Sequence, residues 1–223
     1  MYWSQVPAPP VRGMRFSSAE VTQILIAIGA LTLAFTLAQI GGIYGIGGIG
    51  GFPTAVLGLI AVTSFVAVVT AFLLHELAHK AVAQAYGCYA EFRAFPMGLL
   101  FGILTAAFGF LFAAPGAVMI SGPVSPRQNA RISAAGPGTN FVLAAVFFAL
   151  ALALLGPSPR FYEPVPRLVA SIGFVNLFLG GFNMVPFPPL DGSKIFAYNK
   201  ALWIAMVAIL AALAFGAWQL HLI

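Results

Sequence analysis

Long apolar segments alternate along this chain with short polar ones, and few polar residues interrupt the apolar segments. Runs of about 20 apolar residues are long enough to cross a bilayer as helices. Four runs are predicted to span in this way, over residues 21–40, 132–155, 168–184 and 201–220. A further helix over 55–86 is longer than the bilayer core is thick. The pattern predicts an all-α polytopic membrane protein with five to six transmembrane segments.

Three segments depart from this helical pattern. Residues 88–95 and 116–121 suit β-strands and predict a short membrane-associated hairpin. The apolar run 98–113 between them is marginal in length for a span. The segment 41–51 is too rich in glycine for a stable helix, because each glycine costs about 1 kcal/mol relative to alanine. It is predicted to be a flexible apolar loop, with a gate beside a substrate path as the alternative.

The composition agrees with a membrane protein and excludes an ordinary soluble one. Of 223 residues, 61% are hydrophobic and 7% are charged. The net charge of +5 comes from basic residues that flank apolar segments, so it indicates topology rather than nucleic-acid binding. We expect residues 1–18 to form a tail and 19–223 a single transmembrane domain with its core at about 55–195. Cys88 is alone, so no intrachain disulfide can form.

A metal-binding pattern lies near the end of the long helix, in the sequence His75-Glu76-Leu77-Ala78-His79. Two histidines four residues apart lie on one helix face and can bind one metal ion. Glu76 lies beside them, where it can take a proton from a bound water. This is the H-E-x-x-H pattern of zinc hydrolases. The chain has only three histidines and five acidic residues, so packing is a poor explanation for this cluster.

A catalytic zinc uses three protein ligands, so one more is needed. The candidates are Glu20, Cys88, Glu91, Glu163, Asp191 and His221. Glu20, Glu163 and His221 lie at segment ends or in a loop, where a solvated position is cheaper. Glu91 is expected to be a surface charge, and a lone Cys88 is more often inert than a ligand. Asp191 follows a spanning run in a proline-rich stretch, where an acid is costly unless it is paired or ligating.

Two motifs in this order resemble the site-2 protease family of intramembrane zinc metalloproteases. They are His75-Glu76-xx-His79 and Asn183-xx-Pro186-xxx-Leu190-Asp191-Gly192, and Gly136-Pro137-xx-Asn140 resembles a further segment of that family. The resemblance implies one zinc ion per chain bound by His75, His79 and Asp191, with Glu76 as general base. It also implies that Asn183 orients the substrate or stabilises an oxyanion. Asn140 is a weaker candidate for that role, and an interhelical hydrogen bond is its alternative.

The resemblance implies regulated intramembrane proteolysis, in which a peptide bond is hydrolysed within or near the transmembrane helix of a membrane-protein substrate. Such a helix must unwind first, and the predicted strands can hold it extended by strand addition. A purely structural hairpin is the alternative. Water must reach the zinc, so a polar channel from the cytoplasmic side is expected.

Three other functions compete with this one. A membrane metal-ion transporter should carry several polar residues along its depth, and this chain has almost none elsewhere. A protease of the type that processes prenylated proteins should have a later glutamate-bearing ligand motif, and none is present. A catalytically inactive homologue is disfavoured by the intact ligand set. Oligomeric state and substrate identity are not indicated.

Topology follows from the need for the ligands to meet. In the family the motif helix and the Asp helix run parallel, with one antiparallel helix between them. If residues 98–113 spanned the membrane, Asp191 would reach the face opposite His75, so we expect this segment to re-enter. Lys80 is expected to snorkel to the interface.

Basic residues test this topology independently. With re-entry and a cytoplasmic N-terminus, eight of them lie on the cytoplasmic side: Arg12, Arg15, Lys80, Arg93, Arg127, Arg131, Lys194 and Lys200. Arg160 and Arg167 lie outside. If residues 98–113 spanned instead, the split would fall to six and four. The sequence therefore predicts a multi-pass protein, in the cell membrane, with its active site in the bilayer near the cytoplasmic face.

Overall fold

The computed structural model describes residues 13–46, 53–155 and 164–223. Five helices in these ranges are long and apolar enough to cross a membrane. They are α1 (Ser18–Gln39), a continuous helix made of α3 (Thr54–Ala67), the π-helical η2 (Val68–Leu73) and α4 (Leu74–Ala85), α6 (Pro126–Leu155), α7 (Pro164–Asn183) and α9 (Lys200–Gln219). The protein is a polytopic membrane protein of the all-α class, as predicted.

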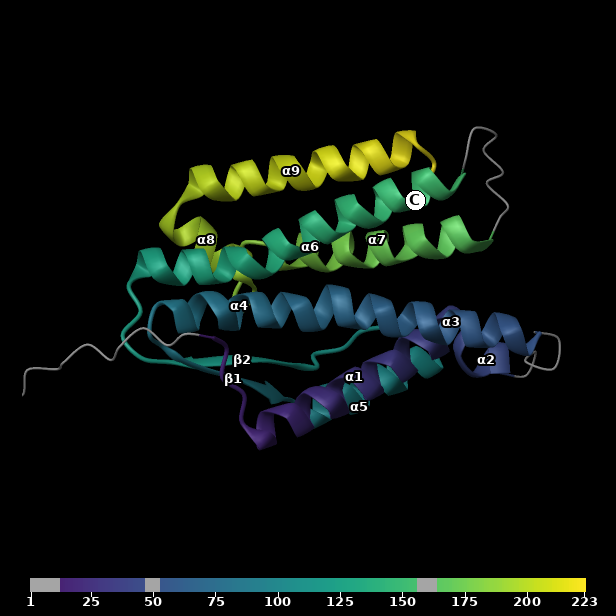
Figure 1. Ribbon diagram of the computed structural model, residues 1–223, viewed down its shortest axis with the longest axis horizontal. Coiled ribbons are helices and arrows are strands. Elements are labelled where there is room, and N and C mark those ends of the chain that lie inside the picture. The colour runs from purple at the N-terminus through teal and green to yellow at the C-terminus, as the bar shows by residue number, and fades with distance from the viewer. Residues whose placement is uncertain (1–12, 47–52, 156–163) are drawn as a thin grey trace, which may run out of the picture.

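The long helices lie side by side in an elongated bundle (Figure 1). At one end of the bundle α1 begins, α4 ends, α6 begins, and the short helix α8 (Asp191–Tyr198) leads into α9. At the opposite end α6 ends and α7 begins. This arrangement brings the start of α8 to the same end of the bundle as α4, as the topology argument requires.

A two-stranded hairpin lies at this end of the bundle. Strands β1 (Tyr89–Ala94) and β2 (Gly116–Ser121) pair antiparallel, with Tyr89 opposite Ser121 and Ala94 opposite Gly116. The chain between them forms α5 (Pro96–Ala107), which packs against α1, and then returns. A helix of 12 residues is about 18 Å long, shorter than the ~30 Å bilayer core. Because the strands pair, this segment comes back to the side that it left, as predicted.

The glycine-rich segment differs from its prediction as a loop. A short helix, α2 (Gly42–Ile46), follows α1 directly. Gly41 and Gly42 adopt positive φ values of 85° and 64°, which turn the chain without a steric penalty. A Cβ at Gly42 would lie 2.6 Å from the backbone nitrogen of Gly109, so close packing against the end of α5 needs glycine here. The loop prediction is wrong for residues 42–46, and its remainder, 47–51, lies outside the described residues.

Two charges expected to reach water are buried together instead. Lys80 and Glu20 are fully buried, and their side chains form an ion pair. The same Glu20 carboxylate accepts a hydrogen bond of 2.8 Å from the backbone nitrogen of Phe92 in β1. The predicted snorkelling of Lys80 and the predicted solvation of Glu20 are therefore wrong. Because α1 packs against β1 and against η2, the turn just before α4, both groups are shielded from water, and buried charges persist when they are paired.

Glu91 is also buried rather than a free surface charge. Its carboxylate accepts hydrogen bonds from the hydroxyls of Ser17 and Tyr89 and pairs with Arg93 at 2.8 Å. The Ser17 hydroxyl, followed by that of Tyr89, holds the pKa of Glu91 below its ordinary value. The side chain thereby ties the chain just before α1 to the hairpin.

The outward edge of β1 is occupied by side chains from the helices beside it. Phe92 donates its N–H to Glu20, and Ala94 donates its N–H to Gln23 Oε1 at 2.8 Å. The Ala90 carbonyl accepts from Gln84 Nε2 at 3.2 Å. On the other strand, β2, the outward N–H of Val118 bonds Glu76, so this edge of the hairpin faces the metal-binding motif.

Candidate active site

The three predicted metal ligands meet in the structure. His75 and His79 project from α4, Asp191 begins α8, and all three side chains are buried. His79 Nε2 lies 3.0 Å from His75 Nε2 and 3.0 Å from Asp191 Oδ2, and His75 Nε2 lies 3.5 Å from the same oxygen. Within the described part of the chain, these three side chains form a group whose ligand atoms lie close enough together to hold one metal ion.

This cluster fits zinc. Ligand atoms about 2.0–2.2 Å from a tetrahedral zinc are separated by about 3.4 Å. The three observed separations lie close to that value, so small adjustments suffice. Two imidazoles and one carboxylate are also a donor set used by catalytic zinc, which keeps its fourth position open.

Local packing explains why a glycine follows Asp191. A Cβ at Gly192 would lie 2.7 Å from the Val185 carbonyl oxygen and closer still to that of Met184. Trp203 of α9 donates a hydrogen bond of 2.8 Å to the Met184 carbonyl and so anchors the same turn. The tight turn after α7 therefore directs Asp191 back toward α4.

The environment of Asp191 favours its ionised, ligating form. Burial by itself raises the pKa of this carboxyl, but contacts with His75 and His79 and the nearby Lys194 outweigh burial and hold the pKa well below its usual range. Lys194 Nζ lies 3.3 Å from Oδ1, whereas Oδ2 faces the two imidazoles. One carboxylate oxygen is thus held by a cation while the other remains directed at the metal position.

Both imidazoles are oriented through their second nitrogen. His75 Nδ1 contacts Asn140 Oδ1, and His79 Nδ1 lies 2.7 Å from the Ile132 carbonyl oxygen. With each Nδ1–H donated to an oxygen, both Nε2 atoms are left free to bind metal. The sequence did not reveal the contribution of Ile132, because a backbone carbonyl leaves no signal in residue type.

Asn140 belongs to a buried polar network that continues away from the metal centre. Its Nδ2 donates to the Ala71 carbonyl at 2.9 Å and to Asn176 Oδ1 at 3.2 Å. Asn176 Nδ2 in turn donates to Thr70 Oγ1 at 3.0 Å. Thr70 and Ala71 lie in η2, a π-helical turn that the sequence did not predict. The Asn140 amide is fully used within the protein, which corresponds to the interhelical alternative rather than to a substrate contact.

We expect Asn140→Ala to weaken zinc binding by about 10–100-fold, the range typical of residues that orient metal ligands. Asn176→Ala should have a smaller effect because it acts through Asn140. The measurement is zinc affinity in detergent by competition with a chelator of known affinity. Ser171→Ala is the control, since among the described residues that hydroxyl bonds the Leu168 carbonyl of its own helix and not the metal site. Unchanged affinity in Asn140→Ala would contradict an orienting role.

The other candidates occupy different positions. Asn183 donates to the Leu179 carbonyl of its own helix at 3.0 Å and does not touch the metal cluster here, so its predicted oxyanion role stays a prediction. Cys88 is buried beside Ala83 and Ala90, apart from the metal ligands. Glu163 lies outside the described residues.

Glu76, the predicted general base, makes a contact that the sequence did not predict. Its Oε2 accepts a hydrogen bond of 2.9 Å from the backbone nitrogen of Val118 in β2. The hairpin is thus attached to α1 through Glu20 on one edge and to α4 through Glu76 on the other.

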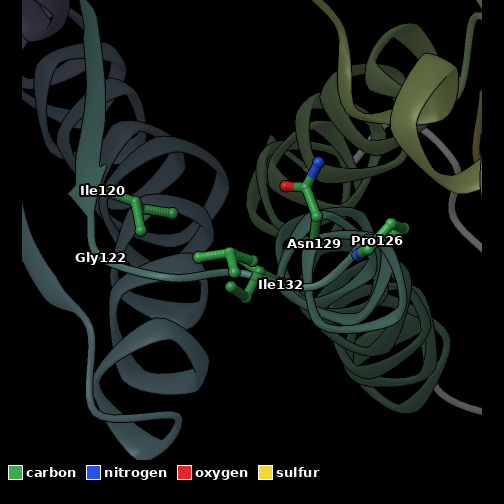
Figure 2. A pocket seen from close by; sticks show the side chains of 6 residues that line it. Ile120, Gly122, Pro126, Asn129 and Ile132 are labelled. Carbon is green, nitrogen blue, oxygen red and sulfur yellow. The ribbon is translucent and has the colours of Figure 1, made fainter. Parts of the chain in front are cut away.

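A cavity of about 450 Å³ opens beside the end of β2. Figure 2 shows Ile120 on one side and Pro126, Asn129 and Ile132 from the start of α6 on the other. The carbonyl of Ile132 bonds His79, so this cavity adjoins the metal centre. Asn129 is the polar side chain in its lining, and the walls are otherwise apolar or backbone. The cavity exposes both polar and apolar atoms, and the expected water channel to the zinc stays a prediction.

Together, the transmembrane helices and the buried ligand cluster define a membrane-embedded zinc metalloprotease, and comparison with known proteins agrees. The chain matches peptidase family M50 over residues 63–166. It is 38% identical, over 85% of its length and 89% of the relative's, to a protein of Methanocaldococcus jannaschii named as a candidate zinc metalloprotease. The chain belongs to peptidase family M50, which confirms the resemblance to site-2 proteases.

Other relatives are larger proteins. The candidate zinc metalloprotease Rip3 of Mycobacterium tuberculosis is 35% identical over 67% of this chain, which covers 34% of that protein. A second Methanocaldococcus jannaschii protein, named a zinc metalloprotease, is 26% identical over 59% of this chain and 32% of its own length. No solved structure matches the chain significantly.

Proposed function

We propose that this metalloprotease hydrolyses peptide bonds within or near the transmembrane segments of membrane-protein substrates. The observation that carries the proposal is the position of the ligands. His75 and His79 lie buried in the helix of residues 54–85, which is long and apolar enough to span a membrane. A metal centre built into such a helix serves substrates that are themselves in the membrane.

The chain's own groups divide the chemistry among them. A zinc ion, one per chain, would polarise the scissile carbonyl and make a water more acidic. The Glu76 carboxylate accepts the proton of the attacking water and then delivers it to the leaving amine nitrogen. Asn183 is the candidate for orienting the substrate or supporting the developing oxyanion.

The free edge of β2 is our candidate for the substrate-binding surface. The β1 edge is satisfied by Glu20, Gln23 and Gln84, whereas on the outward edge of β2 the described residues show one such hydrogen bond, from Val118 to Glu76. An extended peptide added here would form backbone hydrogen bonds beside the general base. Because a helical substrate hides its carbonyls in its own hydrogen bonds, strand addition also explains how it is held unwound.

The distribution of basic residues along the bundle orients the protein in the membrane. Most of the basic residues lie on elements at the end of the bundle that carries the metal ligands, such as the end of α4, the start of α6 and α8, which supports a cytoplasmic N-terminus. The active site then lies within the bilayer near the cytoplasmic face of the cell membrane.

Metal removal tests the proposed activity directly. Purified protein in lipid vesicles should cleave a model peptide with a helix-breaking residue inside its transmembrane segment. A zinc chelator should abolish cleavage and added zinc should restore it, because the ligands Asp191, His75 and His79 converge on one metal position. Cleavage that persists without metal, or zinc-loaded protein that never cleaves such a peptide, would refute the proposal.

A further inference from the structure

The Val118 N–H occupies a special place on the hairpin. Val118 is paired with Phe92 in the β1–β2 register. The N–H of Phe92 points away from the hairpin to Glu20, and the N–H of Val118 points away on the opposite edge to Glu76. In an antiparallel pair such residues do not bond each other, so both of their N–H groups are available to an outside partner.

An added strand would need that same N–H. On the free edge of β2 the outward backbone groups belong to Gly116, Val118 and Ile120, which alternate along the strand. Val118 is the middle one of the three. A peptide that pairs with this edge therefore requires the donor that Glu76 occupies in the free protein.

We propose that the Val118 N–H is a substrate-binding group, and that a carbonyl of the incoming extended peptide displaces the Glu76 carboxylate from it. The inference rests on the proposed function. Substrate binding then frees the Glu76 carboxylate, the general base, from β2, so that it lies next to the newly bound peptide bond. The same hydrogen-bond donor thereby links substrate binding to the availability of Glu76 as proton acceptor.

The surroundings of the edge favour a peptide as the occupant. Beyond Ile120 the strand leads to Gly122 and Val124, which line the 450 Å³ cavity with Ile132 (Figure 2). A chain that pairs along β2 can continue into this space, where Ile120, Val124 and Ile132 offer apolar contacts to the side chains of a transmembrane segment. Its route then passes the residue whose carbonyl orients His79.

A double-mutant cycle on peptide binding tests the inference without catalysis. The probe is a fluorescein-labelled model transmembrane peptide of about 20 Leu and Ala residues with a central Asn-Pro helix break. Its affinity for zinc-free protein in detergent is measured by fluorescence anisotropy. Glu76→Leu removes the competing acceptor, and Val118→Pro removes the donor at a position where an edge strand tolerates proline.

We expect Glu76→Leu to bind the peptide about fivefold more tightly than the unchanged protein, the factor expected for one ordinary hydrogen bond. In the Val118→Pro background the same substitution should have no effect. In a Val118→Ala background, which keeps the N–H, the fivefold effect should return. An equal effect of Glu76→Leu in all three backgrounds, or none in the unchanged protein, would overturn the inference.

Amide hydrogen exchange supplies a second measurement if Val118→Pro fails to fold. The Val118 amide should exchange slowly in the unchanged protein, faster in Glu76→Leu, and slowly again in that variant with peptide bound. If peptide leaves this amide exchanging fast, the inference is wrong even where cleavage by zinc-loaded protein is intact. Absence of any cleavage by zinc-loaded protein would instead refute the proposed function.

Discussion

Glu76→Gln is expected to lower the rate of substrate cleavage by about 10²–10⁴-fold while zinc remains bound. The glutamine side chain has a similar size but cannot accept the proton of the attacking water. The metal ligands His75, His79 and Asp191 are unchanged, so the metal centre should persist. The measurement is single-turnover cleavage of a model transmembrane substrate, with zinc content determined on the same sample.

The control for this variant is Glu91→Gln. Glu91 is also a buried carboxylate and lies in strand β1 of the hairpin. It contacts Ser17, Tyr89 and Arg93 rather than the metal ligands. We expect its effect on the catalytic rate to be far smaller than that of Glu76→Gln. Full activity in Glu76→Gln would show that another group takes the proton.

Gly136→Ala is expected to reduce zinc affinity by about 100-fold, the upper end of the usual range for disturbed ligand orientation, because it disturbs both histidine ligands at once. A Cβ at Gly136 would lie 2.6 Å from His75 Nε2 and closer still to His79 Nε2. These are the atoms that face the metal, and both rings are held from behind by Asn140 and Ile132. The rings therefore cannot retreat without losing those hydrogen bonds.

A matched control lies two residues further along the same helix. A Cβ at Gly138 would meet no atom within 4 Å, so Gly138→Ala changes the helix equally but not the site. Zinc affinity in Gly138→Ala should equal that of the unchanged protein, as measured by chelator competition. Equal affinities for Gly136→Ala and Gly138→Ala would mean that the close approach of α6 to α4 is not maintained in the membrane.

The structure alters one argument against an ion transporter. The sequence showed almost no polar residues in the apolar segments besides the motifs, yet Asn176 and Thr70 lie in the core beside Asn140. Their side chains bond one another and the backbone, as in the bond from Asn176 to the Ile172 carbonyl. The network therefore fixes the helices around His75 instead of forming a row of free ligands for a passing ion.

Much of the fold followed from local pattern. Apolar runs of membrane length predicted the spanning helices, and residues 116–121 were predicted as a strand with the bounds observed for β2. These features depend on backbone geometry and on transfer of side chains from water, which act over neighbouring residues. The expectations that failed, for Lys80, Glu20, Glu91 and residues 42–46, depended on what packs beside them.

The sequence by itself determined that His75 and His79 share one helix face, because the helical repeat places residues four apart together. With the family resemblance it also indicated Asp191 as their partner. Only the tertiary structure decided that Gly136 makes room for the imidazoles, that Asn176 supports Asn140, and that the Val118 N–H binds Glu76. Those contacts join residues distant in sequence, and their existence depends on how closely the packed helices and the hairpin approach.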